Sequence, residues 1–136
     1  MRPRKLHIEG FTCFRDPVEI DFSGMDVFVI SGPTGAGKTT IVDAICYALY
    51  GEVARETKAP DLIARGAPAM RVQLEFDAGG ERYRVHRGVN VTRSTNKKTG
   101  AEKVTRDISP VQFEMYRNGE WEPRADRVVE IDRAIV

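Results

Sequence analysis

The stretch that decides the fold is Ser31-Gly32-Pro33-Thr34-Gly35-Ala36-Gly37-Lys38-Thr39-Thr40. It matches the P-loop pattern G-x-x-x-x-G-K-[ST], whose backbone N–H groups surround phosphates. The apolar run at 27–30 precedes it and is typical of a strand buried on both faces. From Lys38 to Tyr50, apolar residues recur three or four positions apart, which predicts a helix closed by Gly51. A strand, a glycine-rich loop and a helix in this order predict a nucleotide-binding α/β fold.

Each residue type in the loop has a chemical role in binding ATP and Mg²⁺. Gly35 and Gly37 allow backbone angles that turn successive N–H groups towards an anion. Lys38 supplies a positive charge to the β- and γ-phosphates and is the catalytic candidate, while Thr39 can ligate the Mg²⁺ that bridges them. The predicted nucleotide-binding residues are Gly32, Pro33, Thr34, Gly35, Ala36, Gly37, Lys38, Thr39 and Thr40.

Alternation of apolar and polar residues predicts antiparallel strands around this unit. Residues 6–9 and 18–22 predict one hairpin, and residues 70–77 and 83–91 predict a second hairpin that turns at Gly79-Gly80. The polar segment 92–100 is predicted as a hairpin tip, and residues 111–121 as a hairpin around Asn118-Gly119, so the antiparallel region covers about 70–121. Pro123 is predicted to open a final helix over about 124–136.

A complete P-loop ATPase also needs an acidic residue at the end of a second buried strand to hold magnesium. No run of four apolar residues after Thr40 ends in Asp or Glu. We therefore expect the magnesium acid to lie outside this chain; the alternative is that the strands after Thr40 are assigned wrongly.

Composition limits the remaining classes. The chain has 136 residues, of which 41% are hydrophobic and 30% charged, as expected for one globular domain. It contains no apolar run of 18 residues, and no continuous apolar stretch follows the basic start, so we expect no membrane partner and no export. Cys13 and Cys46 fit no metal-binding pattern and are expected to be reduced thiols in the cytoplasm.

The charge is uneven along the chain. Between Arg82 and Arg106, five Arg and three Lys stand against one acidic residue, a net charge of +7 on a chain whose total is +1. This basic block predicts contact with an anionic partner, with a solvated loop as the alternative. His7 and His86 are expected to be ordinary surface residues.

Several segments closely resemble the N-terminus of the SbcC family, bacterial SMC-like ATPases of DNA double-strand-break processing that act with the nuclease SbcD. The resemblance lies in residues 5–11, 20–22, 30–40 and 43–51, and continues through Ala64-Arg65-Gly66 and the hairpin at 70–87. The run GPTGAGKTT followed by DAICYALYG distinguishes it from SMC, RecN and RecF relatives, which usually carry Asn at the third variable P-loop position.

The resemblance implies a P-loop NTPase of the ABC/SMC head type, with residues 1–136 as its N-terminal lobe and a mixed sheet that includes an antiparallel β-subdomain. The final helix would lead towards a glutamine loop and a coiled coil. The C-terminal lobe of the same protein would supply the signature motif, the magnesium acid and the catalytic glutamate. The complete protein would be an ATPase, whereas this fragment alone would be inactive.

In such a protein, ATP binding would join two heads into a homodimer, and hydrolysis would reopen them and control the access of SbcD to double-stranded DNA near the nucleoid. Carried over by position, Thr12 would lie near the nucleotide base, and Arg65 would be a base-side contact. The charge of +7 and the family's function together predict that the basic block contacts DNA phosphates through Arg93, Lys97, Lys98 and Lys103. Two alternatives stay open: another SMC-like ATPase of the RecF or RecN type, and a nucleotide-gated DNA-binding scaffold without turnover.

Overall fold

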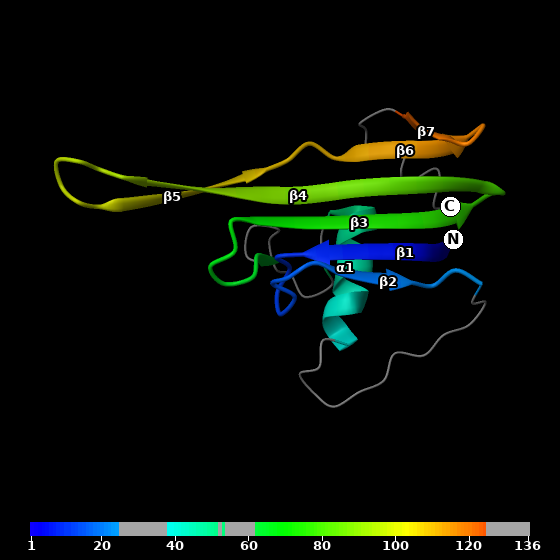
Figure 1. Cartoon of the computed structure of the whole chain (residues 1–136), viewed down its shortest axis with the longest axis horizontal. Helices are drawn as coiled ribbons and strands as arrows, with labels where there is room; N and C mark the ends of the chain where they lie inside the picture. Colours follow the sequence, from blue (N-terminus) through cyan, green and yellow to red (C-terminus); the bar gives the residue numbers. More distant parts are fainter. Residues whose placement is uncertain (25–37, 52, 54–61, 125–136) are drawn as a thin grey trace.

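A single antiparallel sheet and one helix packed on its face make up the described part of the chain (Figure 1). The computed structural model describes residues 1–24, 38–51, 53 and 62–124. The helix is α1 (Lys38–Tyr50). The strands are β1 (Arg2–Glu9), β2 (Val18–Asp21), β3 (Ala69–Ala78), β4 (Glu81–Thr95), β5 (Glu102–Ile108), β6 (Gln112–Arg117) and β7 (Glu120–Pro123).

The strands lie in the order β2-β1-β3-β4-β6-β7, and β5 pairs with the outer part of β4. β4 is long enough to pair with two strands in succession: His86 lies opposite Gln112 of β6, and Val89 lies opposite Ile108 of β5. β4 and β5 therefore continue as a two-stranded ribbon that projects beyond the rest of the sheet (Figure 1). We call residues 90–108 the ribbon.

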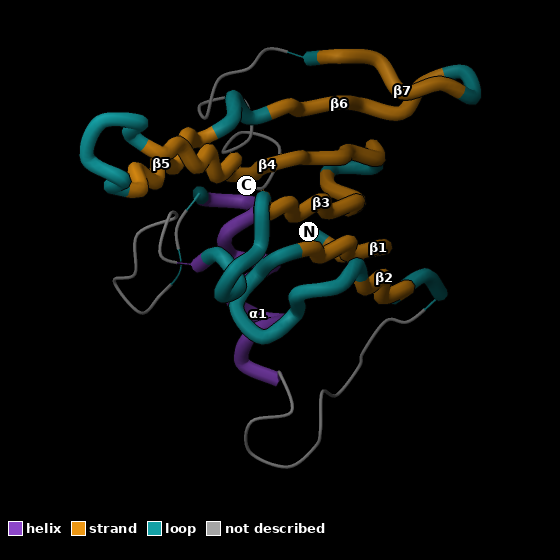
Figure 2. The backbone as a smooth tube through the Cα atoms, turned by 60° about the vertical axis from the view of Figure 1, so that its left-hand side comes forward, coloured by secondary structure: helices purple, strands orange, loops and turns teal. Residues whose placement is uncertain are grey.

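The alternation of β3 explains how the sheet packs. Met70, Val72, Leu74 and Phe76 are buried, and their neighbours in β1 and β4 at the same register include Leu6 and Val85. These side chains point towards α1, which covers this face of the sheet (Figure 2). The opposite face, here called the open face, presents the polar positions of the same strands.

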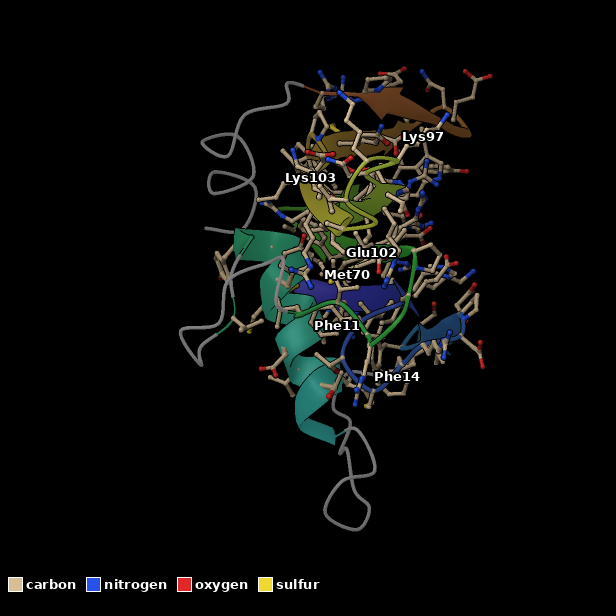
Figure 3. All side chains as sticks on the ribbon, turned by 90° about the vertical axis from the view of Figure 1, so that its left-hand side faces the viewer. Phe11, Phe14, Met70, Lys97, Glu102 and Lys103 are labelled. Carbon is tan, nitrogen blue, oxygen red and sulfur yellow. The ribbon has the colours of Figure 1, made fainter. Side chains whose placement is uncertain are left out.

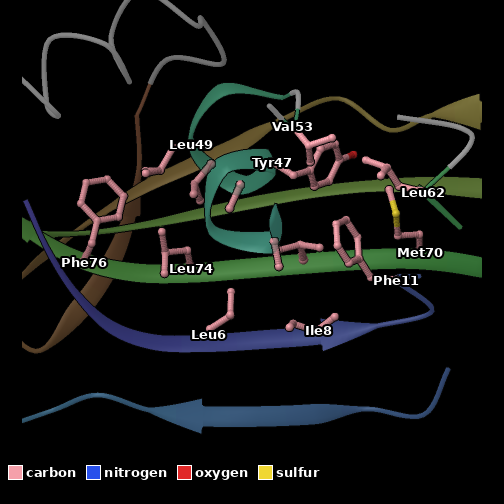
Figure 4. Close-up of a cluster of buried hydrophobic side chains, with 14 of the residues drawn as sticks. Leu6, Ile8, Phe11, Tyr47, Leu49, Val53, Leu62, Met70, Leu74 and Phe76 are labelled. Atoms are coloured by element: carbon pink, nitrogen blue, oxygen red, sulfur yellow. The ribbon is translucent and has the colours of Figure 1, made fainter. Parts of the chain in front are cut away.

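The core lies between α1 and the sheet. Tyr47, Ala48 and Leu49 of the helix are almost fully buried and belong to one cluster with the apolar side chains of β1, β3 and β4 (Figure 4). Phe11 joins this cluster from the loop between β1 and β2, where its ring centroid lies 5.9 Å from that of Tyr47. The loop that follows β1 is thereby held against the helix.

Most of the predicted elements are confirmed, with three corrections. The helix at 38–50 and the hairpins at 6–22, 70–91 and 111–121 are present. Residues 92–95 continue β4 rather than forming the hairpin tip, and β5 was not predicted. Pro123 does not open a helix, because it is the last residue of β7 and pairs with Glu114. The strand predicted at 27–30 and the helix predicted after residue 124 lie outside the described residues.

Candidate functional site

The first turn of α1 is the described part of the predicted nucleotide site. Lys38, Thr39 and Thr40 form the start of the helix, directly after the glycine-rich stretch. Residues 32–37 and the side chains of Lys38 and Thr39 lie outside what is described. The first N–H groups of a helix have no partner within it and carry partial positive charge, so they attract phosphate. α1 has no acidic residue in its first turn that would compete with an anion there.

The loop between β1 and β2 lies beside this turn. The Thr12 hydroxyl donates a hydrogen bond to Oγ1 of Thr40 over 3.1 Å, and Sγ of Cys13 lies 3.6 Å from the same oxygen. Thr40 is only 9% exposed, and these two neighbours provide its hydroxyl with hydrogen-bond partners in place of water. The structure thus brings Thr12, predicted near the nucleotide base, to the first turn of the P-loop helix.

Thr12 holds an unusual backbone angle. Its φ is +45°, a left-handed value that costs a β-branched residue of the order of 1–3 kcal/mol. The surrounding contacts maintain it, because Thr12 N–H donates to the carbonyl of Leu62 over 2.7 Å in addition to the bond with Thr40. Strain of this kind is concentrated at binding and catalytic sites, where the position of one side chain matters more than local stability.

Arg65 lies in a segment that pairs with the same loop. Ala64 N–H donates to the carbonyl of Gly10 over 2.6 Å, and Phe11 forms an isolated bridge with Ile63. Arg65 itself is exposed at the turn that follows. The fold therefore gathers the two residues predicted on the base side, Thr12 and Arg65, around two segments that hydrogen-bond to each other.

The basic block does not form one surface. Arg82 and Arg84 lie on the open face, where Arg82 is 3.6 Å from Asp77 and Arg84 makes two hydrogen bonds of 2.9 and 3.0 Å to Glu114. Arg87 points to the other face, towards α1. Only the members of the block beyond Asn90 belong to the ribbon, so the positive charge that is free for a partner is concentrated there.

All four predicted DNA-binding residues lie on the ribbon and are exposed. Lys97 stands at its tip and Lys103 on β5 (Figure 3). Arg93 is partly neutralised because its guanidinium lies 3.2 Å from Oε1 of Glu102 across the strand pair. The lysines at 97, 98 and 103 are thus the stronger candidates for contact with phosphates.

His86 is not the exposed residue expected from the sequence. It is half-buried on the open face, with Nε2 3.1 Å from Oε1 of Glu114. Burial lowers the pKa of His86, Arg84 lowers it further, and Glu114 opposes both effects. Burial raises the pKa of Glu114, but the hydrogen bonds and charges of Arg84 and His86 outweigh this, so its pKa lies below the usual range. The guanidinium of Arg84 also lies over the ring of Trp121, 4.3 Å from its centroid.

Sequence reasoning missed Arg87. Its Nε donates to the carbonyl of Ala48 over 2.8 Å, and its Nη2 donates to that of Leu49 over 3.3 Å. Its position in the sequence could have identified it. Arg87 lies between Val85 and Val89, at one of the alternating positions of β4 that face the core. A charged residue at such a position must find polar partners inside the fold.

Comparison with known proteins places the chain in a family. Residues 5–125 match the family described as AAA domain. The chain belongs to the AAA domain family. It is 39% identical over 124 residues to the SbcC subunit of the nuclease SbcCD of Deinococcus radiodurans, covering 89% of the chain and 12% of that protein. It is 48% identical over 90 residues to a probable DNA double-strand break repair Rad50 ATPase of Aquifex aeolicus, covering 64% of the chain and 9% of that protein. The predicted resemblance to the SbcC family is confirmed, and the chain spans only a small part of these relatives.

Solved structures support the predicted fold class. The SMC head domain of Thermotoga maritima is 28% identical with a TM-score of 0.54, covering 98% of the chain and 42% of that structure. A structure from work on ATP-driven dimerization and DNA-stimulated activation of SMC ATPases has a TM-score of 0.61 at 24% identity, covering 98% of the chain and 77% of that structure. At 24% identity, the similarity to this last structure establishes a shared fold and nothing about function. Among the described residues, no helix has the length and apolarity needed to cross a bilayer.

Proposed function

We propose that residues 1–136 are the N-terminal, ATP-binding lobe of a split SbcC-like ATPase head. The observation that supports this most directly is the anchoring of α1. The P-loop sequence enters a helix whose first turn is joined to the Thr12 loop and whose body is buried against the sheet. A phosphate held at that turn would therefore meet a helix whose position is set by contacts at its first turn and along its body.

In this proposal, residues 32–40 hold the phosphates of ATP. Lys38 neutralises the β- and γ-phosphates, Thr39 ligates Mg²⁺, and Thr12 and Arg65 lie on the base side. When bound, Mg²⁺ supplies charge neutralisation between the phosphates. The C-terminal lobe of the same protein supplies the magnesium acid and the group that orients the attacking water.

The complete protein would then act as an ATPase in DNA double-strand-break and hairpin processing, recombination and repair. ATP would draw two heads together as a homodimer, and hydrolysis would release them and admit the SbcD nuclease to double-stranded DNA. The relatives, the SbcC subunit of a nuclease SbcCD and a probable Rad50 ATPase of double-strand break repair, support this assignment. We propose a cytoplasmic, nucleoid-associated location on the same basis.

A RecF-type identity is less well supported. The RecF–ATP structure shares the fold at a TM-score of 0.55 but only 14% identity, whereas the SbcC proteins share 34–42%. A nucleotide-gated scaffold without turnover differs from an ATPase in one measurable respect. Steady-state ATP turnover of the complete protein, with and without duplex DNA, separates the two.

The P-loop assignment is tested by Lys38→Ala in the full-length protein. A charge-assisted contact to phosphate contributes about 1.5–3 kcal/mol, so we expect ATP affinity to fall roughly ten- to hundredfold by calorimetry. Lys5→Ala is the matched control, because Lys5 lies on the open face of β1 and pairs with Glu19 at 3.7 Å. Unchanged ATP affinity in Lys38→Ala would contradict the assignment.

A further inference from the structure

Arg87 occupies a position where an apolar side chain is expected. It lies opposite Val72 of β3 and between two buried valines of β4, on the face that packs against α1. Burying a guanidinium part-way costs free energy unless hydrogen bonds replace its water. The structure provides two such bonds from the helix.

Two partners of Arg87 are carbonyls in the last turn of α1. Its Nε and Nη2 donate to Ala48 and Leu49 over 2.8 and 3.3 Å. These carbonyls are among the last four of the helix, which have no N–H partner within the helix itself. Gly51 ends the helix with a φ of +77° and an N–H bond of 2.8 Å to Tyr47, and a Cβ at Gly51 would lie 3.0 Å from the Arg87 guanidinium. The positive charge is also favourable at the negative end of the helix dipole.

This contact differs in kind from the apolar packing around it. Apolar contacts between α1 and the sheet do not depend on direction, so they permit small shifts of the helix along its axis. Two hydrogen bonds to consecutive carbonyls depend on distance and angle, so they fix the axial position and rotation of α1 relative to β4. At the opposite end of the helix, the bond between Thr12 and Thr40 holds the first turn to the β1–β2 loop.

β4 extends from this contact into the ribbon. It is one continuous strand from Glu81 to Thr95, and Arg93 stands six residues beyond Arg87, about 20 Å along the strand. From Lys38 to Ala48, α1 spans about 15 Å. Arg87 therefore adds directed hydrogen bonds between the last turn of α1 and the middle of β4, from which the strand continues into the ribbon.

We propose that Arg87 is a positioning residue that couples the nucleotide site at the start of α1 to the ribbon at the end of β4. The inference rests on the proposed function, in which ATP binds before α1 and DNA binds the ribbon. A displacement of the first turn of α1 by nucleotide moves its last turn, and Arg87 transfers that movement to β4. Because coupling between two binding sites is reciprocal, DNA on the ribbon must change ATP affinity by the same factor.

The test uses the full-length protein and two matched variants. Arg87→Met keeps the apolar stem of the side chain and removes the donors. Arg71→Met makes the same change on β3, at an exposed position of the open face. For each protein, the affinity for a DNA duplex is measured with and without a non-hydrolysable ATP analogue. The affinity for the analogue is likewise measured with and without the duplex. The coupling factor is the ratio of the two affinities in each pair of measurements. Couplings of this type amount to about 5–150-fold.

We expect wild type and Arg71→Met to show the same coupling factor in both directions. In Arg87→Met the factor should fall to within about twofold of one, while each separate affinity stays within about threefold of wild type. Equal coupling in Arg87→Met and wild type would overturn the inference. So would loss of ATP binding in Arg87→Met without DNA present, because the residue would then serve the site itself.

A measurement on the wild type does not depend on how the variant folds. Hydrogen exchange of peptides covering residues 47–51 is compared with and without duplex DNA. We expect slower exchange on DNA binding, although these residues lie at the end of α1 and not on the ribbon. No change there refutes the coupling. A wild-type protein that binds no ATP or no duplex instead refutes the proposed function.

Discussion

Gly10 sets how closely the loop after β1 approaches β3, and Gly10→Ala tests this. Gly10 has a φ of +65°, and an added Cβ would overlap the carbonyl oxygen of Ala69, the first residue of β3. That oxygen belongs to the backbone, so it cannot rotate away as a flexible side chain would. Either the loop or the start of β3 must shift.

The expected cost has two parts. The positive φ alone costs alanine about 1 kcal/mol. A shift of the loop would also strain the bonds from Gly10 N–H to Arg15, 3.2 Å, and from Ala64 N–H to Gly10, 2.6 Å, each contributing about 0.5–1.5 kcal/mol. The total is about 2–4 kcal/mol. Gly79→Ala is the matched control, because Gly79 has a φ of +57° and no atom within 4 Å of an added Cβ, so only the first part applies.

The two variants should therefore differ by about 2 kcal/mol, or about 30-fold in the population of locally opened molecules. Hydrogen exchange of the full-length protein measures this population in peptides that cover β1 and β3. We expect exchange in these peptides to be about 30-fold faster in Gly10→Ala than in Gly79→Ala. Rates within threefold of each other would show that the close approach of Gly10 and Ala69 does not matter for stability.

The further predictions concern charge and completeness. Serine replacements on the ribbon at Arg93, Lys97, Lys98 and Lys103 should weaken duplex binding by the full-length protein and reduce the slope of log affinity against log salt. Wild-type affinity and slope would contradict a role of these residues in phosphate contact. Replacing Lys97 should cost more than replacing Arg93, which pairs with Glu102. The lowered pKa of His86 means that the unfolded chain binds more protons below about pH 6.5, so stability should fall as the pH drops through that value. His86→Gln should flatten this part of a stability profile measured by denaturant unfolding, and an unchanged slope would assign it to other groups. Residues 1–136 alone should show no magnesium-dependent ATP turnover, since they lack an evident magnesium acid. Turnover by this fragment that the Lys38→Ala substitution abolishes would refute the split-head proposal. Exposed Val42 and Tyr50 on α1 also lead us to expect aggregation of the lone chain, which the C-terminal lobe added in trans should suppress in light scattering.

Local patterns were sufficient to predict much of this chain. The helix at 38–50 follows from the spacing of its apolar residues, and β3 follows from strict alternation, because both elements bury one face against the same core. Asn118-Gly119 specified its hairpin through backbone conformation, with Asn118 at a φ of +52°. In each case the pattern that indicates the element lies within a few residues along the chain.

Tertiary structure decided the rest. β5 is exposed along its whole length, so burial imposed no alternation on it, and only pairing with β4 makes it a strand. Pro123 was expected to start a helix, but it ends strand β7. Because β7 lies at the edge of the described sheet, a proline there can lack its N–H without breaking a hydrogen bond between strands. The contacts of Thr12 with Thr40 and of Arg87 with α1 join residues 28 and 39 positions apart. No local pattern encodes such contacts, because the free energy that fixes them comes from the packing of the helix on the sheet.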